Sequence, residues 1–166
     1  MKISLVIPAY NEEKYLGACL ASARANVKNL LEIIVVVNSS ADQTEAVARS
    51  FPGVKVVREN VRGPNRARQR GLKEAQGDIV ACVDADTIIP PGWSEIMIQL
   101  FTQDSKVVAV SGPYVYYDQS RLGKMLVWLF LHLFARVAYW FTGYLALGGN
   151  FAAKREALEA IGGFNC

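Results

Sequence analysis

The nine residues DIVACVDAD at positions 78–86 do most to determine the fold. The apolar run Ile79–Val83 is typical of a strand that is buried on both faces of a parallel sheet. Directly after it come Asp84 and Asp86, separated by one alanine. Charged groups at the mouth of a buried strand are costly unless a cation compensates them. The pair therefore indicates a binding site more strongly than an isolated Asp-x-Asp turn would.

The chain begins with another predicted strand that is followed by polar residues. The apolar run Ile3–Ile7 predicts a strand, and the loop PAYNEE follows it at positions 8–13. Open α/β sheets bind ligands beyond the carboxyl ends of their strands, so we expect both loops at one site. Two carboxylates one residue apart can reach a divalent cation, which is the usual means of holding a diphosphate. Together the two segments predict a nucleotide-sugar site.

Short strands and helices alternate along the first two thirds of the sequence. Strands are expected at 3–7, 32–37, 54–58, 79–83 and 107–111, and helices at 13–25, 42–50, 64–75 and 91–101. This alternation predicts an α/β fold with a mostly parallel central sheet flanked by helices.

Length and charge limit the class of protein. The 166 residues suffice for a single domain with a sizeable core, and the formal net charge of +3 is mild. Sites for single-stranded nucleic acid interleave basic and aromatic residues, but no aromatic residue occurs between Phe51 and Trp93, where the arginines gather. We therefore expect no nucleic-acid partner.

Cysteine usage and the start of the chain both favour the cytosol. The cysteines Cys19, Cys82 and Cys166 are odd in number and show no Cys-x-x-Cys spacing. Cys19 and Cys82 lie in apolar patterns, which predicts reduced core thiols and not a disulfide or metal site. Because the first strand begins at Ile3, we expect no signal peptide and a cytoplasmic location.

The segment Met125–Leu147 departs from the alternating pattern. It carries charge only at Arg136, and an arginine at the centre of a membrane-spanning helix costs roughly 2.5–3.5 kcal/mol. Positions 124, 128, 132, 136 and 140 hold Lys, Trp, His, Arg and Trp, so a helix would present one polar and aromatic face. That face is typical of a helix at the membrane surface. A helix buried in the core or in a homodimer, and a spanning helix, are the alternatives. The expected location is thus cytoplasmic and peripheral at the inner face of the membrane.

Four motifs, taken in order, resemble the family-two glycosyltransferases, which are inverting enzymes of the GT-A fold. The motifs are IPAYNEE at 7–13, VDAD at 83–86, LGGNFAAKRE at 147–156 and IGGF at 161–164. The resemblance implies a GT-A-like, nucleotide-diphospho-sugar transferase domain over residues 1–166. Its nucleotide-sugar-binding half would be residues 1–111, and residues 112–166 would form an incomplete region facing the acceptor or the membrane. It also implies a nucleotide-sugar donor, a divalent cation (Mg²⁺ or Mn²⁺) and a glycan or lipid-linked acceptor such as a polyprenyl phosphate.

The resemblance also suggests which residues hold the donor. The expected donor contacts are Pro8, Tyr10, Glu12, Val37, Asn38, Arg68, Asp84, Ala85, Gly149 and Asn150. Asp86 is the expected metal ligand, because the second acid of the family's pair coordinates the cation that bridges the diphosphate. Arg68 is expected to bind a phosphate, or to lock the loop that carries Asp84 and Asp86 (the acid loop) through bidentate hydrogen bonds.

The second strand departs from the family pattern. The family usually ends this strand with two acids, the first of which contacts the base, but this chain has Val37 and Asn38. The identity of the base is therefore left open. Asp42 is predicted to cap the next helix, and Arg58 and Arg62 are predicted to lie on a solvated face.

No candidate catalytic base is found. An inverting transfer needs a group that takes the proton of the acceptor hydroxyl, and in the family a Glu-Asp pair beyond the Gly-Gly-Phe element supplies it. The sequence given stops at Cys166, so we expect it to bind donor and metal but to transfer sugar slowly or not at all. A non-catalytic nucleotide-sugar-binding domain is the first alternative. A nucleotidyltransferase is disfavoured because its glycine-rich opening loop is missing before Gly17.

Overall fold

The computed structural model describes residues 1–112 and 149–164 and, between them, positions 120, 122, 123, 125, 126, 129, 133, 134, 137, 140 and 141. The strands are β1 (Ile3–Ala9), β2 (Leu30–Asn38), β3 (Val54–Glu59), β4 (Ile79–Val83), β5 (Ala109–Ser111) and β6 (Asn150–Lys154). The helices are α1 (Leu16–Asn26), α2 (Thr44–Arg49), α3 (Pro64–Glu74), α4 (Trp93–Gln103) and α6 (Arg155–Ala160).

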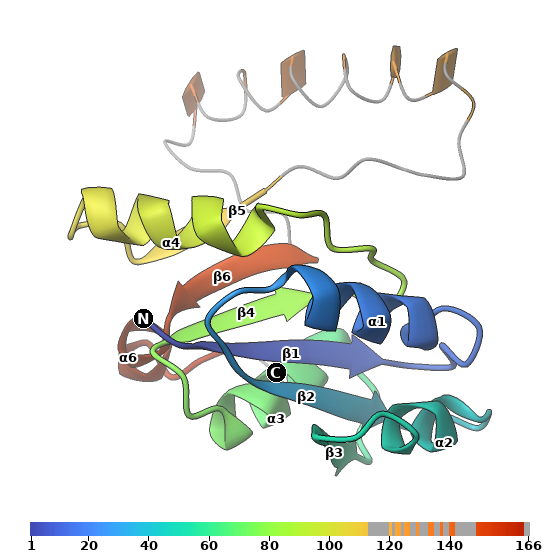
Figure 1. Cartoon of the computed structure of the whole chain (residues 1–166). Helices are drawn as coiled ribbons and strands as arrows, with labels where there is room; N and C mark the ends of the chain where they lie inside the picture. The colour runs from blue at the N-terminus through green and yellow to red at the C-terminus, as the bar shows by residue number, and fades with distance from the viewer. Residues whose placement is uncertain are drawn as a thin grey trace.

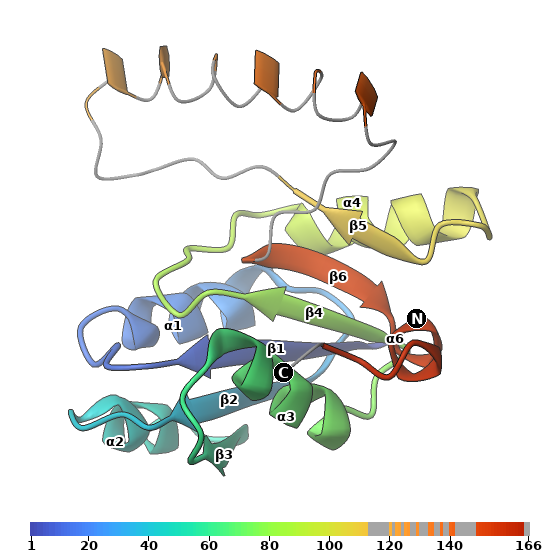
Figure 2. The same ribbon diagram turned by 180° about the vertical axis from the view of Figure 1, so that it is seen from behind.

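One sheet forms the centre of the molecule, with the strand order β3-β2-β1-β4-β6-β5. The four strands β3, β2, β1 and β4 are parallel to one another. Strand β6 pairs antiparallel with both β4 and β5. Helices cover both faces of this sheet, as Figures 1 and 2 show from opposite sides. The predicted α/β architecture, with a mostly parallel central sheet, is confirmed.

The alternation of side chains along β1 explains the two helical layers. Ile3, Leu5 and Ile7 belong to a buried cluster that includes residues of α1 and α4. Val6 points the other way, into a second cluster with residues of α3 and α6. Because neighbouring residues of a strand face opposite sides of the sheet, a strand with buried apolar residues on both faces needs a helix on each face.

The strand β6 was not predicted. No strand was expected at residues 150–154, whereas they form an antiparallel strand inserted between β4 and β5, with Val83 opposite Asn150. The segment Asn150–Lys154 contains two alanines, which are depleted in strands. Its strand conformation depends on hydrogen bonds to two strands that are distant in sequence. The local sequence pattern therefore does not predict it.

Apolar side chains of the segment between 122 and 141 are exposed wherever the structure describes them. They are Leu122, Met125, Leu126, Leu129, Leu133, Phe134, Val137, Trp140 and Phe141, each helical and between 46% and 79% exposed. Spacings of three and four residues place most of them on one side of a helix. Within the part of the chain that is described, no helix is long and apolar enough to cross a membrane. The rest of the predicted segment Met125–Leu147 lies outside the described residues.

The thiols of Cys19 and Cys82 are free and buried, as predicted. Burial raises the pKa of each to about 12. Both are therefore protonated and inert at neutral pH. Cys166 lies outside the described residues.

Helix α3 packs against β1 through a glycine. A Cβ atom added at Gly71 would overlap the side chain of Val6, which is fully buried at the centre of the sheet. Only a residue without a side chain lets the helix approach this closely, and α3 carries Arg68 to the site.

We predict that Gly71→Ala destabilises the protein by about 1–3 kcal/mol, because a β-branched valine in a packed core cannot move aside. Gly17→Ala is the matched control, since its Cβ would lie 3.9 Å from Val47 Cγ1 in ordinary contact. It should instead stabilise α1 by up to about 1 kcal/mol. Urea unfolding measures both, and equal effects of the two substitutions would contradict the packing argument.

Candidate functional site

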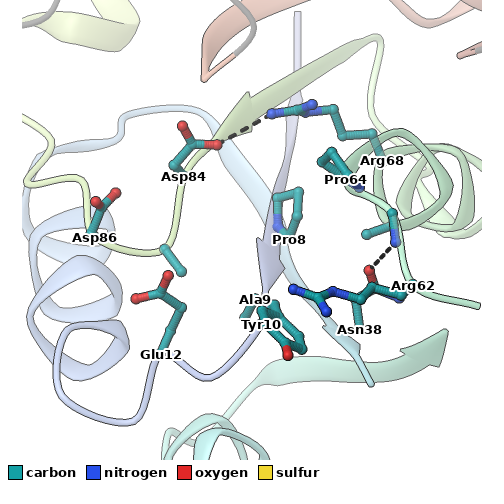
Figure 3. Close-up of a pocket in the computed structure, with 13 residues that line it drawn as sticks. Pro8, Ala9, Tyr10, Glu12, Asn38, Arg62, Pro64, Arg68, Asp84 and Asp86 are labelled. Carbon is teal, nitrogen blue, oxygen red and sulfur yellow. Dashed lines mark hydrogen bonds and ion pairs between the residues drawn. The ribbon is translucent and has the colours of Figure 1, made fainter. Parts of the chain in front are cut away.

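A pocket of about 390 Å³ opens at the carboxyl ends of the parallel strands. It lies where the order of the strands reverses, because β1 has β2 on one side and β4 on the other. Such a switch point is the ligand crevice of open α/β sheets. Most of the predicted site residues line it, namely Pro8, Tyr10, Glu12, Asn38, Arg68, Asp84, Ala85 and Asp86 (Figure 3).

Three predicted residues do not line the pocket. Val37 is only 5% exposed and packs into the core on the α1 face of the sheet, because its neighbour Asn38 takes the opposite direction. The Gly149 carbonyl accepts the N–H of Asp84 at 3.3 Å. The Asn150 side chain accepts a hydrogen bond from Trp93 Nε1 at 2.9 Å. Gly149 therefore supports the acid loop through a backbone hydrogen bond outside the pocket, and Asn150 connects β6 to α4.

The loop that carries Tyr10 and Glu12 is fixed by the loop after β2. Asn11 adopts a left-handed backbone conformation, with φ of 56°, and its Oδ1 accepts the N–H of Ala41 at 2.9 Å. The Glu12 N–H donates to Thr44 Oγ1 at 2.8 Å. These bonds satisfy backbone groups that a loop would otherwise leave to water, so Tyr10 and Glu12 face the pocket from a defined backbone.

Asp42 has two partners in this arrangement. Its carboxylate accepts the N–H of Thr44, the first residue of α2, at 3.0 Å. It also accepts the N–H of Glu13 at 3.1 Å. The first contact agrees with the predicted role at the start of the helix, and the second shows that Asp42 also positions the loop that carries Tyr10 and Glu12.

Arg68 bridges helix α3 and the acid loop. Its Nη2 lies 3.2 Å from Asp84 Oδ1, and its side chain is 13% exposed. Nη1 donates to Asn65 Oδ1 at 3.3 Å. Within the described part of the chain, Arg68 Nε is buried and has no hydrogen-bond partner. Arg68 therefore holds the acid loop through a single contact and not the bidentate one that was expected, and one of its N–H groups is without a partner among the described residues.

Negative charge accumulates on the opposite wall of the pocket, where Figure 3 shows Glu12, Asp84 and Asp86 together. Burial raises the pKa of Glu12, and the charges of Asp86, Asp42 and Asp84 add to the effect. Burial also raises the pKa of Asp84, with Arg68 opposing the rise and Asp86 adding to it. The carboxylates thus repel one another across the pocket, a situation that a cation would relieve.

A divalent cation fits this donor set. The described residues include no group of three or more acidic, histidine or cysteine side chains that could hold a metal by themselves. Mg²⁺ is usually held by only one or two carboxylates together with phosphate oxygens and water. Asp86 is exposed at the pocket and offers hard oxygen ligands, so it suits a cation that arrives with a diphosphate.

Arg62 is exposed, as expected for a residue on a solvated face, but it also lines the pocket. Its guanidinium carbon lies 4.2 Å from the centre of the Tyr10 ring. Arg58 does lie on the surface, where it pairs with Glu45 at 2.8 Å. One signal could have separated the two arginines. Arg62 directly precedes the helix that carries Arg68 to the carboxyl edge of the sheet.

The sheet and the pocket define an α/β protein of the GT-A class. The chain aligns with a mannosyltransferase from Pyrobaculum calidifontis, solved with GDP-Man and Mn²⁺, at a TM-score of 0.77 and 26% identity. That alignment covers 99% of this chain and 47% of the mannosyltransferase. It also aligns with the UDP complex of glucosyl-3-phosphoglycerate synthase from Mycobacterium tuberculosis (TM-score 0.68, 29% identity, 95% of this chain and 58% of that one).

The sequence pattern of the family described as Glycosyl transferase family 2 matches residues 4–162, and the chain belongs to this family. A dolichol-phosphate mannosyltransferase from Pyrococcus furiosus is 30% identical over 177 residues, which cover 97% of this chain and 48% of that protein. A glucosyl-dolichyl phosphate glucuronosyltransferase from Haloferax volcanii is 25% identical, with 99% and 56% covered. The chain thus spans about half the length of these relatives.

We predict that Glu12→Gln stabilises the ligand-free protein at neutral pH. A carboxyl group whose pKa is raised by folding destabilises the folded state when it is ionised. This loss of unfolding free energy develops as pH rises from the unfolded pKa through the folded pKa. The gain in unfolding free energy should be present near pH ~7 and should vanish near pH ~4, where Glu12 is protonated in both states.

Urea unfolding at the two pH values measures this gain. Glu13→Gln is the control, because Glu13 is an exposed neighbour outside the pocket. A Glu12→Gln gain that is the same at both pH values would show that the effect is not electrostatic.

Proposed function

We propose that this protein transfers a sugar from a nucleoside-diphosphate donor to an acceptor, with the donor bound in the pocket at the β1–β4 switch point. The observation that carries the proposal is the convergence of Tyr10, Arg68 and Asp86 on that pocket. An aromatic face, a guanidinium group and a metal-binding carboxylate are the partners that a base, a phosphate and a diphosphate-bound cation require. Residues 1–111 form the donor half, and residues 112–166 face the acceptor or the membrane.

Each part of the donor has a complementary partner in the pocket. Tyr10 offers its ring to the base, and Glu12 can accept hydrogen bonds from ribose hydroxyls. Arg68 lines the pocket, so the positive charge of its guanidinium group can attract a phosphate while Nη2 holds Asp84. Ala85 is buried between the two acids, so it sets their separation.

Mg²⁺ or Mn²⁺ is the proposed cofactor, with Asp86 as its protein ligand. A bound cation would neutralise the negative charge that grows on the departing nucleoside diphosphate. The pocket contributes three further effects. Arg68 keeps Asp84 in place, the repulsion among the acids favours binding of a cation, and the tethered loop fixes Tyr10 against the donor. Transfer with inversion at the anomeric carbon, which the family resemblance implies, completes the proposal.

We expect Asp86→Asn to abolish Mn²⁺-dependent binding of a nucleoside diphosphate, lowering affinity by about 100-fold or more, because the cation loses its charged protein ligand. Asp78→Asn is the matched control. It changes an exposed aspartate immediately before β4, at the opposite end of the same strand. Calorimetric titration with and without Mn²⁺ measures both variants, with thermal unfolding as a check on the fold. Undiminished metal-dependent affinity of Asp86→Asn would remove the metal assignment.

A lipid-linked acceptor is the proposed substrate class. Two relatives that align over nearly the whole chain are named for reactions involving dolichol phosphates. The exposed apolar side chains between 122 and 141 suit the boundary between headgroups and acyl chains. We therefore propose that this segment rests on a membrane surface without crossing it, which would bring the acceptor to the enzyme.

The protein should float with anionic vesicles at low salt, and binding should weaken as salt rises. The double substitution Leu126→Glu, Leu133→Glu should reduce the bound fraction about 10-fold or more, because two exposed leucines would no longer enter the acyl boundary. Leu31→Glu alters an equally exposed leucine on β2 and should bind as the unmodified protein does. Failure of the unmodified chain to float at low salt would favour the buried or dimeric alternative.

A further inference from the structure

One end of the pocket contains a contact between a cation and an aromatic ring. The guanidinium carbon of Arg62 lies 4.2 Å from the centre of the Tyr10 ring, and both side chains line the pocket. Figure 3 shows the guanidinium group of Arg62 extending toward Tyr10 from the loop on the opposite side. A guanidinium group stacked on an aromatic ring keeps its N–H donors at its edge, where they can reach a ligand in the same plane.

Asn38 is already fully engaged as a hydrogen-bond donor. Its Nδ2 donates to the carbonyl oxygens of Glu59 at 3.0 Å and Val61 at 2.8 Å. Its Oδ1 accepts the N–H of Gly63 at 2.8 Å. An amide side chain has only two N–H groups, so Asn38 has none left for a base. With 4% of its surface exposed, it serves mainly as a structural residue.

All three bonds of Asn38 go to one loop, which extends from Glu59 to Gly63 and carries Arg62. A carboxylate at position 38 could not make the two donor contacts, because it only accepts hydrogen bonds when ionised. The amide of Asn38 thus uses its hydrogen bonds to fix the loop and not to contact a base. The fixed loop places Arg62 beside Tyr10. The group available to read the base at this end of the pocket is then a donor and not an acceptor.

We propose that Arg62 determines the base specificity of the donor. It would select guanine and uracil, which carry a carbonyl oxygen at C6 or C4, over adenine and cytosine, which carry an amino group at the same position. This inference rests on the proposed function. The guanidinium group offers only N–H donors, which pair with a base carbonyl and oppose an exocyclic amino group. Guanine should bind best, because its O6 and N7 are adjacent acceptors that fit the two prongs of a guanidinium group.

Calorimetric titration of GDP, UDP, ADP and CDP in the presence of Mn²⁺ tests the assignment. The unmodified protein should bind GDP about 10-fold or more tightly than ADP, and UDP similarly more tightly than CDP. Arg62→Met keeps an unbranched apolar side chain against Tyr10 but removes every donor. It should reduce both preferences to within about 3-fold, mainly by weakening GDP and UDP binding.

Arg66→Met is the matched control, because Arg66 is exposed near the same loop but does not line the pocket. It removes the same charge, so a general loss of attraction for the diphosphate should appear in both variants, whereas the base preference should survive only in Arg66→Met. The role of Arg62, but not the proposed function, would be overturned by either of two results. One is a base preference in Arg62→Met equal to that of the unmodified protein, and the other is tighter binding of ADP and CDP than of GDP and UDP. Absence of binding by all four nucleotides would overturn the proposed function as well.

Discussion

The central strand β1 pairs in parallel with β2 on one side and β4 on the other, and the geometry of the site depends on this pairing. Parallel strands end at the same edge, so the loops after β1, β2 and β4 all meet there. The loop after β1 supplies Tyr10 and Glu12, and the loop after β4 supplies Asp84 and Asp86. Helix α3 covers the face toward which Val6 points, and this contact carries Arg68 to the same edge. One pairing pattern thus assembles groups that are separated by more than 70 positions in the sequence.

How much of this could be predicted depends on the range of the interactions involved. Strand β4 and the two acids after it could be predicted from a local pattern, because the strand consists of five consecutive apolar residues, all of which are buried. The close packing at Gly71 could not be predicted, because its reason appears only when Val6 lies beside it in the folded chain. Strand β6 could not be predicted, because its conformation comes from two partners contributed by distant segments.

The site shows the same division. Tyr10, Glu12 and the acid pair were predicted because each lies in a short polar stretch after an apolar strand. The role of Asn38 was not predicted, because it depends on three backbone groups of another loop that the side chain happens to reach. The contact of Arg62 with the pocket was not predicted, because a run of arginines indicates only an exposed surface in any local window. Residues whose role is to connect two loops leave no periodic signal, and they are the ones that sequence analysis missed.

The way the two arginines are held suggests how such a pocket can vary its ligand while retaining its chemistry. Arg68 belongs to a helix packed so closely on β1 that only glycine fits between them, and it contacts Asp84. Moving it would disturb the core, so the part of the site that we propose to face the diphosphate is rigid. Arg62 is exposed and belongs to a loop that Asn38 and Ser39 hold through hydrogen bonds. A change at position 62 alters the end of the pocket beside Tyr10 without touching the core, whereas a change at Asn38 would leave buried polar groups without partners. In the proposed donor site, base preference can therefore change through position 62 at low cost in stability, whereas the end proposed for phosphate and metal is tied to the fold.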